Sequence, residues 1–182
     1  MKVGVLALQG GWAAHIQAAR ALGHDAGPVR TAAELAACDG LILPGGESTT
    51  HLKLIDRFDL KGALDGHVAA GKPVLATCAG LILSARAVTH PAQASFGWLD
   101  VTVARNAWGR QVHSFEATAD GSDLPLVFIR APRILDLGPG VEVTHTFEGE
   151  PVGVRQGPFW GVSFHPELTA DQRVHAQVFG RP

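Results

Sequence analysis

Short apolar segments of strand length alternate with helix-like segments through the first half of this chain. The apolar runs cover residues 3–8 (VGVLAL), 40–44 (GLILP) and 73–77 (PVLAT). Between them, apolar residues follow helical spacing, as in residues 12–22, where Gly23 is placed to end the helix. A strand that is apolar on both sides has to be buried on both faces, so this alternation is typical of a mainly parallel sheet covered by helices. The pattern predicts an α/β fold with three layers.

The same half of the chain contains signals for further elements. Thr31 is followed three residues later by Glu34, which is the spacing of a helical capping box. Asp59 and Gly71 are placed to begin and end another helix. Together these signals predict a strand over residues 27–30 and helices over residues 31–38, 59–71 and 79–88.

The rhythm changes after about Pro91, where extended pieces replace the alternation. They cover residues 99–106, 126–132, 141–147, 151–157 and 160–164, and a last helix is expected over residues 170–180. We expect these pieces to add antiparallel strands or hairpins to the same sheet. Because no linker, repeat or low-complexity tract interrupts the chain, residues 1–182 are predicted to form a single domain.

The composition excludes several classes of protein. The chain has 182 residues, of which 46% are hydrophobic, and a net charge of -2 with no basic run longer than two residues, so nucleic-acid binding is not expected. Two cysteines do not make a disulfide framework, and nine scattered histidines lack ligand spacing, so neither a metal nor another cofactor is expected. The N-terminal apolar run is too short for a signal peptide, and no stretch of eighteen apolar residues occurs. We expect a soluble, cytoplasmic protein that does not bind a membrane.

Cys78 follows the apolar run 73–77 and has only small neighbours: Ala76, Ala79 and Gly80. Reactive groups in a parallel sheet collect at the carboxyl ends of its strands, and small residues permit a sharp strand-to-helix turn that exposes a nucleophile. A helix N-terminus also stabilises a thiolate. The alternative is a small, inert core cysteine, which is the interpretation kept for Cys38.

A histidine and a carboxylate follow another apolar strand, in the segment SFHPEL. Pro166 favours an extended His165, and residues two apart in an extended segment point to the same side, so His165 and Glu167 can lie together. Alone, the segment also fits a surface turn at a strand end. Together with Cys78, it predicts a catalytic triad of nucleophile, base and orienting carboxylate.

The segment LPGGES is the third candidate element. Gly45 and Gly46 allow backbone N–H groups to approach a ligand closely, and Glu47 could bind an α-ammonium group. By itself, a glycine pair at the end of a strand is common.

These residues resemble the class I, triad-type glutamine amidotransferases and, within them, the glutaminase subunits of pyridoxal 5'-phosphate synthases. The cysteine and HPE elements are shared by the wider class, whereas the other motifs resemble the vitamin B6 branch. The motifs occur in family order over nearly the whole chain: LALQG (6–10), LILPGGESTT (41–50), TCAGLIL (77–83), RNAWGRQVHSFE (105–116), FIRAP (128–132) and SFHPELT (163–169).

The resemblance implies a fold like that of the class I glutamine amidotransferases and a set of catalytic roles. Cys78 is expected to be the nucleophile, His165 the general base and acid, and Glu167 the residue that orients His165. The backbone N–H groups of Gly46 and Ala79 are expected to form the oxyanion hole.

Further residues match family segments that hold the substrate, L-glutamine: Gly45, Gly46, Glu47, Arg105, Ile129 and Arg130. Gln9 matches a glutamine near the oxyanion hole and the partner contact, although a polar residue that caps a strand end would look the same. Without their flanking motifs, Arg105 and Arg130 would be read as surface charges.

The resemblance also implies a partner. Ammonia released from glutamine would pass through a channel to a synthase subunit, a ring-forming barrel protein that binds and activates the glutaminase. There, the ammonia would be combined with a pentose phosphate and a triose phosphate to make pyridoxal 5'-phosphate.

Five positions depart from the family pattern. Ala76 stands where glycine is usual, and His113 where aspartate is usual. Gly11 and Trp12 replace more polar residues, and His51 is unusual after ESTT. Ala76 bears on the turn at Cys78, because an alanine that needed a positive φ would be strained. The other four lie in segments that could contact the partner or the rim of the site.

Three alternatives remain at this point. The chain could be the glutaminase of another amidotransferase, a binding or regulatory module that keeps the fold without the reaction, or another α/β cysteine hydrolase. The presence of all three triad residues favours an enzyme.

Overall fold

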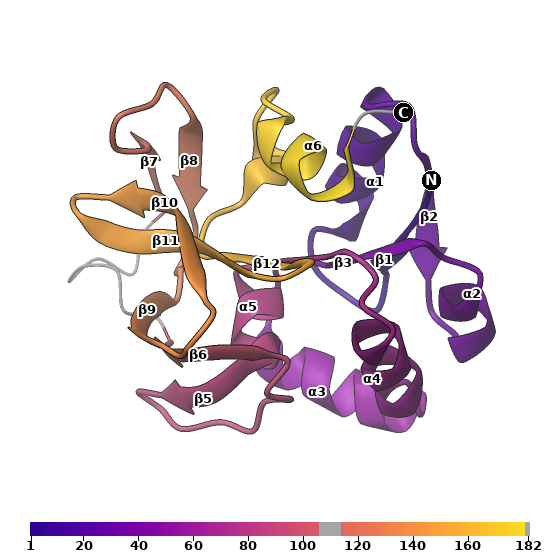
Figure 1. Ribbon diagram of the computed structural model, residues 1–182. Helices are drawn as coiled ribbons and strands as arrows, with labels where there is room; N and C mark the ends of the chain where they lie inside the picture. The colour runs from indigo at the N-terminus through magenta and orange to yellow at the C-terminus, as the bar shows by residue number, and fades with distance from the viewer. Residues whose placement is uncertain (106–113, 181–182) are drawn as a thin grey trace.

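A seven-stranded sheet forms the centre of the computed structural model, which describes residues 1–105 and 114–180 (Figure 1). The strand order is β10 (Glu142–Phe147), β11 (Glu150–Gln156), β12 (Phe159–Val162), β4 (Val74–Thr77), β3 (Gly40–Leu43), β1 (Lys2–Leu6) and β2 (Asp25–Val29). The last five pair in parallel, whereas β11 is antiparallel to both β12 and β10. The predicted α/β class is confirmed. His113, one of the five departures from the family pattern, lies outside the described residues.

The apolar strands divide their side chains between two cores, one on each face of the sheet. Ile42 and Leu75 point into one core, whereas their neighbours Leu41, Leu43 and Val74 point into the other. Because successive side chains of a strand alternate between faces, an unbroken apolar run is what a sheet buried on both sides requires.

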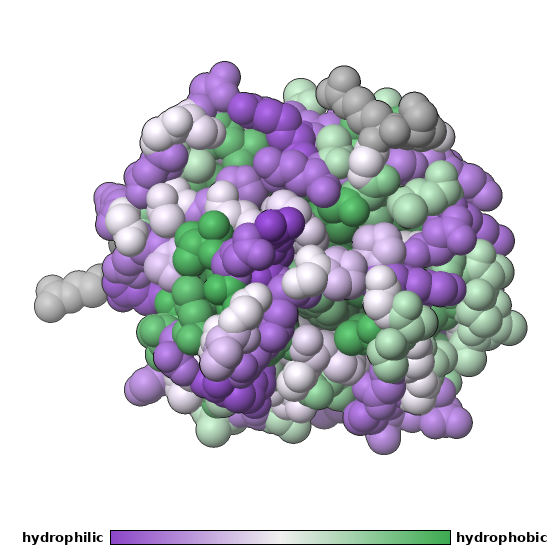
Figure 2. Space-filling model, in the orientation of Figure 1, coloured by the Kyte–Doolittle hydropathy of each residue, from purple (hydrophilic) through white to green (hydrophobic). Residues whose placement is uncertain are grey.

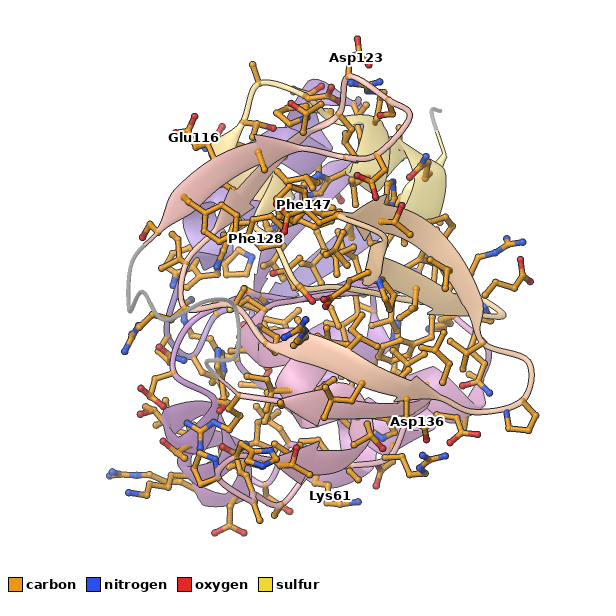
Figure 3. All side chains as sticks on the ribbon, turned by 90° about the vertical axis from the view of Figure 1, so that its left-hand side faces the viewer. Lys61, Glu116, Asp123, Phe128, Asp136 and Phe147 are labelled. Carbon is orange, nitrogen blue, oxygen red and sulfur yellow. The ribbon has the colours of Figure 1, made fainter. Side chains whose placement is uncertain are left out.

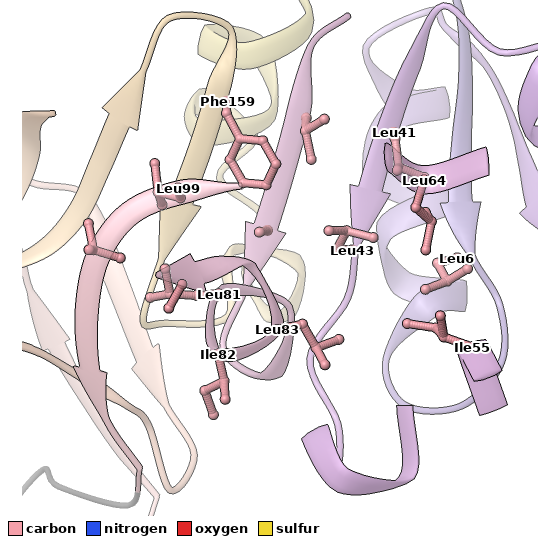
Figure 4. Packing of buried hydrophobic residues seen from close by; sticks show 14 of the residues in the cluster. Leu6, Leu41, Leu43, Ile55, Leu64, Leu81, Ile82, Leu83, Leu99 and Phe159 are labelled. Atoms are coloured by element: carbon pink, nitrogen blue, oxygen red, sulfur yellow. The ribbon is translucent and has the colours of Figure 1, made fainter. Parts of the chain in front are cut away.

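Helices cover both faces, which makes the three layers (Figure 1). On one face lie α1 (Trp12–Ala21) and α6 (Arg173–Phe179), and on the other α2 (Ala32–Ala36), α3 (Ser48–Arg57), α4 (Lys61–Ala69) and α5 (Ala79–Ser84). Ile16 and Val174 pack into the first core, and Ile55, Leu64 and Leu81 into the second, part of which Figure 4 shows.

The extended pieces of the C-terminal half do not all join the central sheet, contrary to the expectation. One small sheet pairs β5 (Ala85–Thr89), β6 (Leu99–Ala104) and β9 (Arg133–Leu137), and another pairs β7 (Phe115–Thr118) with β8 (Pro125–Phe128). The β7–β8 pair docks through aromatic rings: Phe128 lies beside Phe147 of β10, with ring centroids 5.6 Å apart (Figure 3).

Two predicted helices need correction, and one helix was not predicted. The helix expected over residues 79–88 ends at Ser84, because Arg86 instead lies in β5 and forms ion pairs with Asp100 of β6 and Asp136 of β9. Asp59 does not cap α4: it has a φ of 51°, and the helix begins after Leu60. The helix α3 was not predicted.

The capping box predicted at the start of α2 is confirmed. The Thr31 side chain accepts a hydrogen bond from the backbone N–H of Glu34, and the Glu34 carboxylate accepts one from the backbone N–H of Thr31. Reciprocal bonds of this kind satisfy N–H groups that the first turn leaves without partners.

The surface mixes polar and apolar residues (Figure 2). Its large apolar side chains include Leu135 on β9 and Val143 on β10, which are 52% and 46% exposed. Within residues 1–105 and 114–180, no helix has the length and apolar character needed to cross a lipid bilayer.

Leu75 tests the core contribution of the central sheet. It is completely buried on β4, so Leu75→Ala should lower the free energy of unfolding by about 2–5 kcal/mol. The matched control Leu135→Ala, at a half-exposed position, should change it by less than about 0.5 kcal/mol. Urea unfolding of both variants would measure this, and equal losses would contradict the assignment of Leu75 to the core.

Candidate active site

Cys78 lies at the junction of β4 and α5 in an unusual backbone conformation. Its φ is 47° and its ψ is -101°, a combination that residues with a side chain rarely adopt. The surrounding sheet holds it there, because the backbone N–H of Cys78 donates to the carbonyl of Val162 on β12 at 2.9 Å. Ala76 is an ordinary buried strand residue without a positive φ, so alanine is compatible with the fold there. The strain falls on the nucleophile candidate itself.

His165 and Glu167 meet where β12 leads into a short 3-10 helix, η1 (Pro166–Leu168). His165 Nδ1 donates to Glu167 Oε1 at 2.7 Å, and both residues are more than nine-tenths buried. The backbone N–H of His165 donates to the carbonyl of Val127 on β8 at 2.8 Å, which fixes the start of η1 against a different sheet. The two side chains therefore lie together, as their spacing predicts.

Gly45 lies between the histidine and the cysteine. A Cβ atom built on Gly45 would lie 2.4 Å from His165 Cε1 and 3.5 Å from Cys78 Cβ, so only glycine fits here. The Cys78 thiol donates a long hydrogen bond of 3.8 Å to the carbonyl of Ile129, and His165 Nε2 has no hydrogen-bond partner in the described part of the chain. The Nε2 atom is thus available to exchange a proton with a group bound beside Cys78.

The electrostatics of the pair favour a charged histidine. Burial lowers the pKa of His165, but the adjacent Cys78 and Glu167 side chains outweigh burial and raise this pKa to about 10. No well-aligned hydrogen bond joins Cys78 to His165, so we attribute the influence of Cys78 to proximity. Burial raises the pKa of Glu167, but His15 and His165 outweigh it and keep this pKa below its ordinary value. The carboxylate is therefore ionised and faces an imidazolium.

These side chains open onto a cavity of about 320 Å³, which is at the small end for ligand sites. Its lining includes predicted site residues: Gly45, Gly46, Glu47, Cys78, Arg105, Ile129, Arg130, His165 and Glu167. It also includes residues without a predicted role: Gly11, Ser48, Ile82 and Leu168. Gln9 and Ala79 are not part of the lining.

Opposite charges lie next to each other on the cavity wall. Arg105 Nη2 is 3.5 Å from Glu47 Oε1, and the arginine side chain is 15% exposed. Arg130, nearby on the lining, has a φ of 43°. A wall that carries a guanidinium beside a carboxylate is suited to the two charged groups of a free amino acid.

Gln9 connects two loops at the rim of the cavity. Its Nε2 donates to the carbonyl of Glu47 at 3.0 Å, and its Oε1 accepts from the N–H of Glu47 at 3.4 Å. Gly10 next to it has a φ of 80°, and a Cβ there would lie 1.9 Å from the carbonyl oxygen of Gly45. The Gln9 side chain therefore fixes the backbone of the loop that carries Gly45 and Gly46.

Three of the departures from the family pattern are close to this rim. Gly11 lies beside the catalytic pair, since a Cβ there would be 3.2 Å from Glu167 Oε1. The Arg30 guanidinium lies over the Trp12 ring, 5.4 Å from its centroid. His51 is completely buried on α3, and neither ring nitrogen has a hydrogen-bond partner among the residues described. Burial lowers the pKa of His51 to about 4. The backbone of Gly45 acts to raise this pKa but offsets the effect of burial only in part.

Comparison with known proteins is consistent with this geometry. The family model of the SNO glutamine amidotransferase family matches residues 5–181. The chain belongs to this family. The resemblance seen in the motifs is thereby confirmed.

The chain is also similar to curated proteins named "Pyridoxal 5'-phosphate synthase subunit PdxT". The relative from Parafrankia sp. is 54% identical over 181 residues, which cover 96% of this chain and 89% of that protein. The relative from Shouchella clausii is 48% identical over 179 residues, which cover 96% and 92%.

Solved structures agree with the fold. One described as "Crystal structure of glutamine amidotransferase" is 44% identical, has a TM-score of 0.90 and covers 97% of this chain and 96% of its own. The structure of PurLQS from Thermotoga maritima has a TM-score of 0.72 at 15% identity, so it supports the fold alone.

Sequence reasoning missed a second group of buried polar residues behind Glu167: His15 on α1, Thr77 at the end of β4 and His175 on α6. One signal was available. His15 falls beside Ile16 and between Trp12 and Ala19 on the apolar face of its helix, where a histidine is unusual. Within residues 1–105 and 114–180, no group of three or more histidine, cysteine or acidic residues is arranged to hold a metal ion.

Replacing Glu167 should change how stability depends on pH. The raised pKa of His165 contributes stability that is complete below its ordinary value of 6.5 and is lost as the pH rises through about 10. The lowered pKa of Glu167 contributes stability above its ordinary value of 4.5, which is lost as the pH falls. The excess stability of the wild type over Glu167→Gln should therefore be largest between pH 4.5 and 6.5 and should shrink towards pH 10.

Urea unfolding at pH 5.5, 8 and 10 would measure this difference. The exposed Glu116 provides the control: Glu116→Gln should not reproduce the pH dependence of Glu167→Gln, because it leaves the buried pair in place. A Glu167→Gln difference that does not change with pH would contradict the coupling of Glu167 and His165.

His51 should make the protein sensitive to acid. Its pKa of about 4 lies below the ordinary value of 6.5, so the unfolded chain binds a proton between these values while the folded chain does not. The wild type should therefore lose stability between pH 7 and pH 5, and His51→Leu should lose less. Unfolding of both proteins at the two pH values would check this, and equal losses would show that His51 does not contribute.

Proposed function

We propose that this chain is the glutaminase subunit of a pyridoxal 5'-phosphate synthase, which hydrolyses the side-chain amide of L-glutamine and passes the ammonia to a synthase subunit. The observation that carries the proposal is the cluster of Cys78, His165 and Glu167 on a cavity of amino-acid size. It occurs in a chain of the SNO glutamine amidotransferase family whose relatives are named as synthase subunits. The family match also favours this assignment over glutaminases of other amidotransferases.

The first half of the reaction forms a thioester. The thiolate of Cys78 attacks the side-chain amide carbon of glutamine, and the N–H groups of Gly46 and Ala79 stabilise the oxyanion. The amide of Ala79 is suited to this role because the first N–H groups of a helix have no acceptor within the helix. The imidazolium of His165 then protonates the leaving nitrogen, and ammonia departs.

The second half regenerates the enzyme. Neutral His165 removes a proton from a water molecule, the resulting hydroxide attacks the thioester, and glutamate is released as the thiol is restored. Throughout, Glu167 accepts a hydrogen bond from the Nδ1–H group of His165, which leaves Nε2 to exchange protons at the reacting centre.

The charged wall of the cavity would orient the substrate. Arg105 would bind the α-carboxylate of glutamine and Glu47 its α-ammonium group, and Ile129 and Arg130 line the same cavity. Arg105 and Glu47 lie 3.5 Å apart, so their attraction for each other would weaken as each binds a charged group of glutamine.

The partner is a synthase subunit. In our proposal, this subunit is a ring-forming barrel protein. Residues 8–15 and 45–51 flank the cavity and are our candidates for the docking face. Gln9 would couple docking to the oxyanion hole, because it is hydrogen-bonded to Glu47 beside Gly46. We further propose that residues 1–182 form one glutaminase domain that acts in the cytoplasm. One core cluster that contains both Val3 and Phe179 supports the single domain.

The direct test is glutamate formation from glutamine by the chain alone and with the synthase subunit. Activity should rise on mixing, and Cys78→Ala should lower it by at least about 10³-fold, since the nucleophile is removed. Cys38→Ala is the matched control: Cys38 is also buried, but it lies away from the cavity.

Two outcomes would contradict the proposal. Equal activity of Cys78→Ala and the wild type would exclude Cys78 as the nucleophile. No activity in any mixture, with a folded chain and a synthase that works on ammonium salts, would favour a binding module that has lost the reaction.

A further inference from the structure

A line of buried polar side chains continues from Glu167 into the protein, away from the cavity. His15 Nε2 on α1 lies 3.3 Å from Glu167 Oε2, and its Nδ1 lies 2.9 Å from Nε2 of His175 on α6. Both histidines are completely buried, and Thr77 Oγ1 is 3.2 Å from the same Nε2 of His15. The group therefore joins α1, α6 and β4 to the carboxylate that holds His165.

The proton positions in this line follow from the charge of Glu167. A bare Nε2 on His15 would place a lone pair against a carboxylate oxygen, so this nitrogen carries the proton and Nδ1 accepts from Nε2 of His175. The Nε2 proton is better aligned with Thr77 Oγ1 than with Glu167 Oε2, so the contact with the carboxylate is electrostatic. The opposite arrangement would also leave a buried N–H of His175 without an acceptor.

Of the three histidines, His165 alone is set up to carry a charge. Burial lowers the pKa of His15 more than Glu167 raises it, and burial lowers the pKa of His175 to about 3. The pKa of His165, by contrast, is raised to about 10. The one negative charge of Glu167 is thus matched by one imidazolium at the cavity and by a neutral N–H dipole behind it.

We propose that His15 is a positioning residue for the reaction: its Nε2–H faces Glu167 Oε2, so that Oε1 is held towards His165, and His175 fixes the orientation of the His15 ring. The inference rests on the proposed glutaminase function. A role as a metal ligand does not explain the group, because no set of these described residues is arranged around a common metal position.

The first experiment compares side chains at position 15 in the complete chain mixed with the synthase subunit. His15→Leu removes the N–H that faces Glu167, and it should lower kcat for glutamate formation by at least about tenfold, a part of the ~10²–10⁴-fold that a positioned base contributes. KM should change little, since His15 does not line the cavity.

Two conservative variants separate positioning from packing. In His15→Gln, the amide N–H can take the place of Nε2 and should restore most of kcat, whereas the shorter amide of His15→Asn stays near the Nδ1 position and should not. His175→Leu should give a smaller loss than His15→Leu. His67→Leu is the matched control, because His67 is buried on α4 and lies on the other face of the sheet.

A second measurement does not depend on activity. The titration of His165, followed by histidine NMR in the chain alone, should have a midpoint near pH 10 in the wild type. In His15→Leu it should fall by about one pH unit, because the carboxylate is no longer held with Oε1 towards His165 and attracts the imidazolium less strongly. The Gln variant should return towards the wild-type midpoint.

The outcomes distinguish the two proposals. If the wild type makes no glutamate with a competent synthase, the proposed function fails, and the NMR titration still tests the positioning. If the wild type is active and folded His15→Leu keeps both its kcat and its His165 midpoint, the positioning role is overturned. Equal losses in the Gln and Asn variants would likewise reduce His15 to a packing residue.

Discussion

The backbone of Cys78 is the constraint on which the site depends. A φ of 47° lifts the thiol out of the line of β4 and starts α5 one residue later, and such a conformation persists only where neighbours hold it. Here the N–H of Cys78 is bonded to Val162 of β12, and its carbonyl accepts from the N–H of Ile82 in α5. The same β12 leads directly to His165, so a single pair of parallel strands sets the distance between the two reacting side chains.

Close backbone approach is the second requirement. The loops around Gly10 and Gly45 contact each other without room for a side chain, and Gly45 in turn contacts the ring of His165. Gln9 adds hydrogen bonds to both backbone groups of Glu47. The backbone around Gly46, whose N–H would stabilise an oxyanion, is therefore held by contacts between the two loops, so binding of a partner to either loop would act on the other.

The site contains two charged pairs that differ in burial. Arg105 and Glu47 lie at the wall of the cavity, where solvent still weakens their attraction, whereas Glu167 and His165 are almost fully buried and interact strongly. A buried carboxylate is tolerated only when each of its oxygens faces a positive charge or a dipole. For Glu167, His165 on one side and His15 on the other meet this requirement.

The sequence by itself determined the α/β class, the strand that leads to Cys78, the capping box at Thr31 and the local pairing of His165 with Glu167, because each depends on residues close in the chain. Tertiary structure decided what local pattern cannot encode. Arg86 lies in a strand because its carboxylate partners come from distant segments, and the C-terminal strands divide among three sheets according to which apolar faces meet. The buried line behind Glu167 is of the same kind: its members come from α1, β4 and α6, and only packing of these elements brings their side chains within hydrogen-bonding distance.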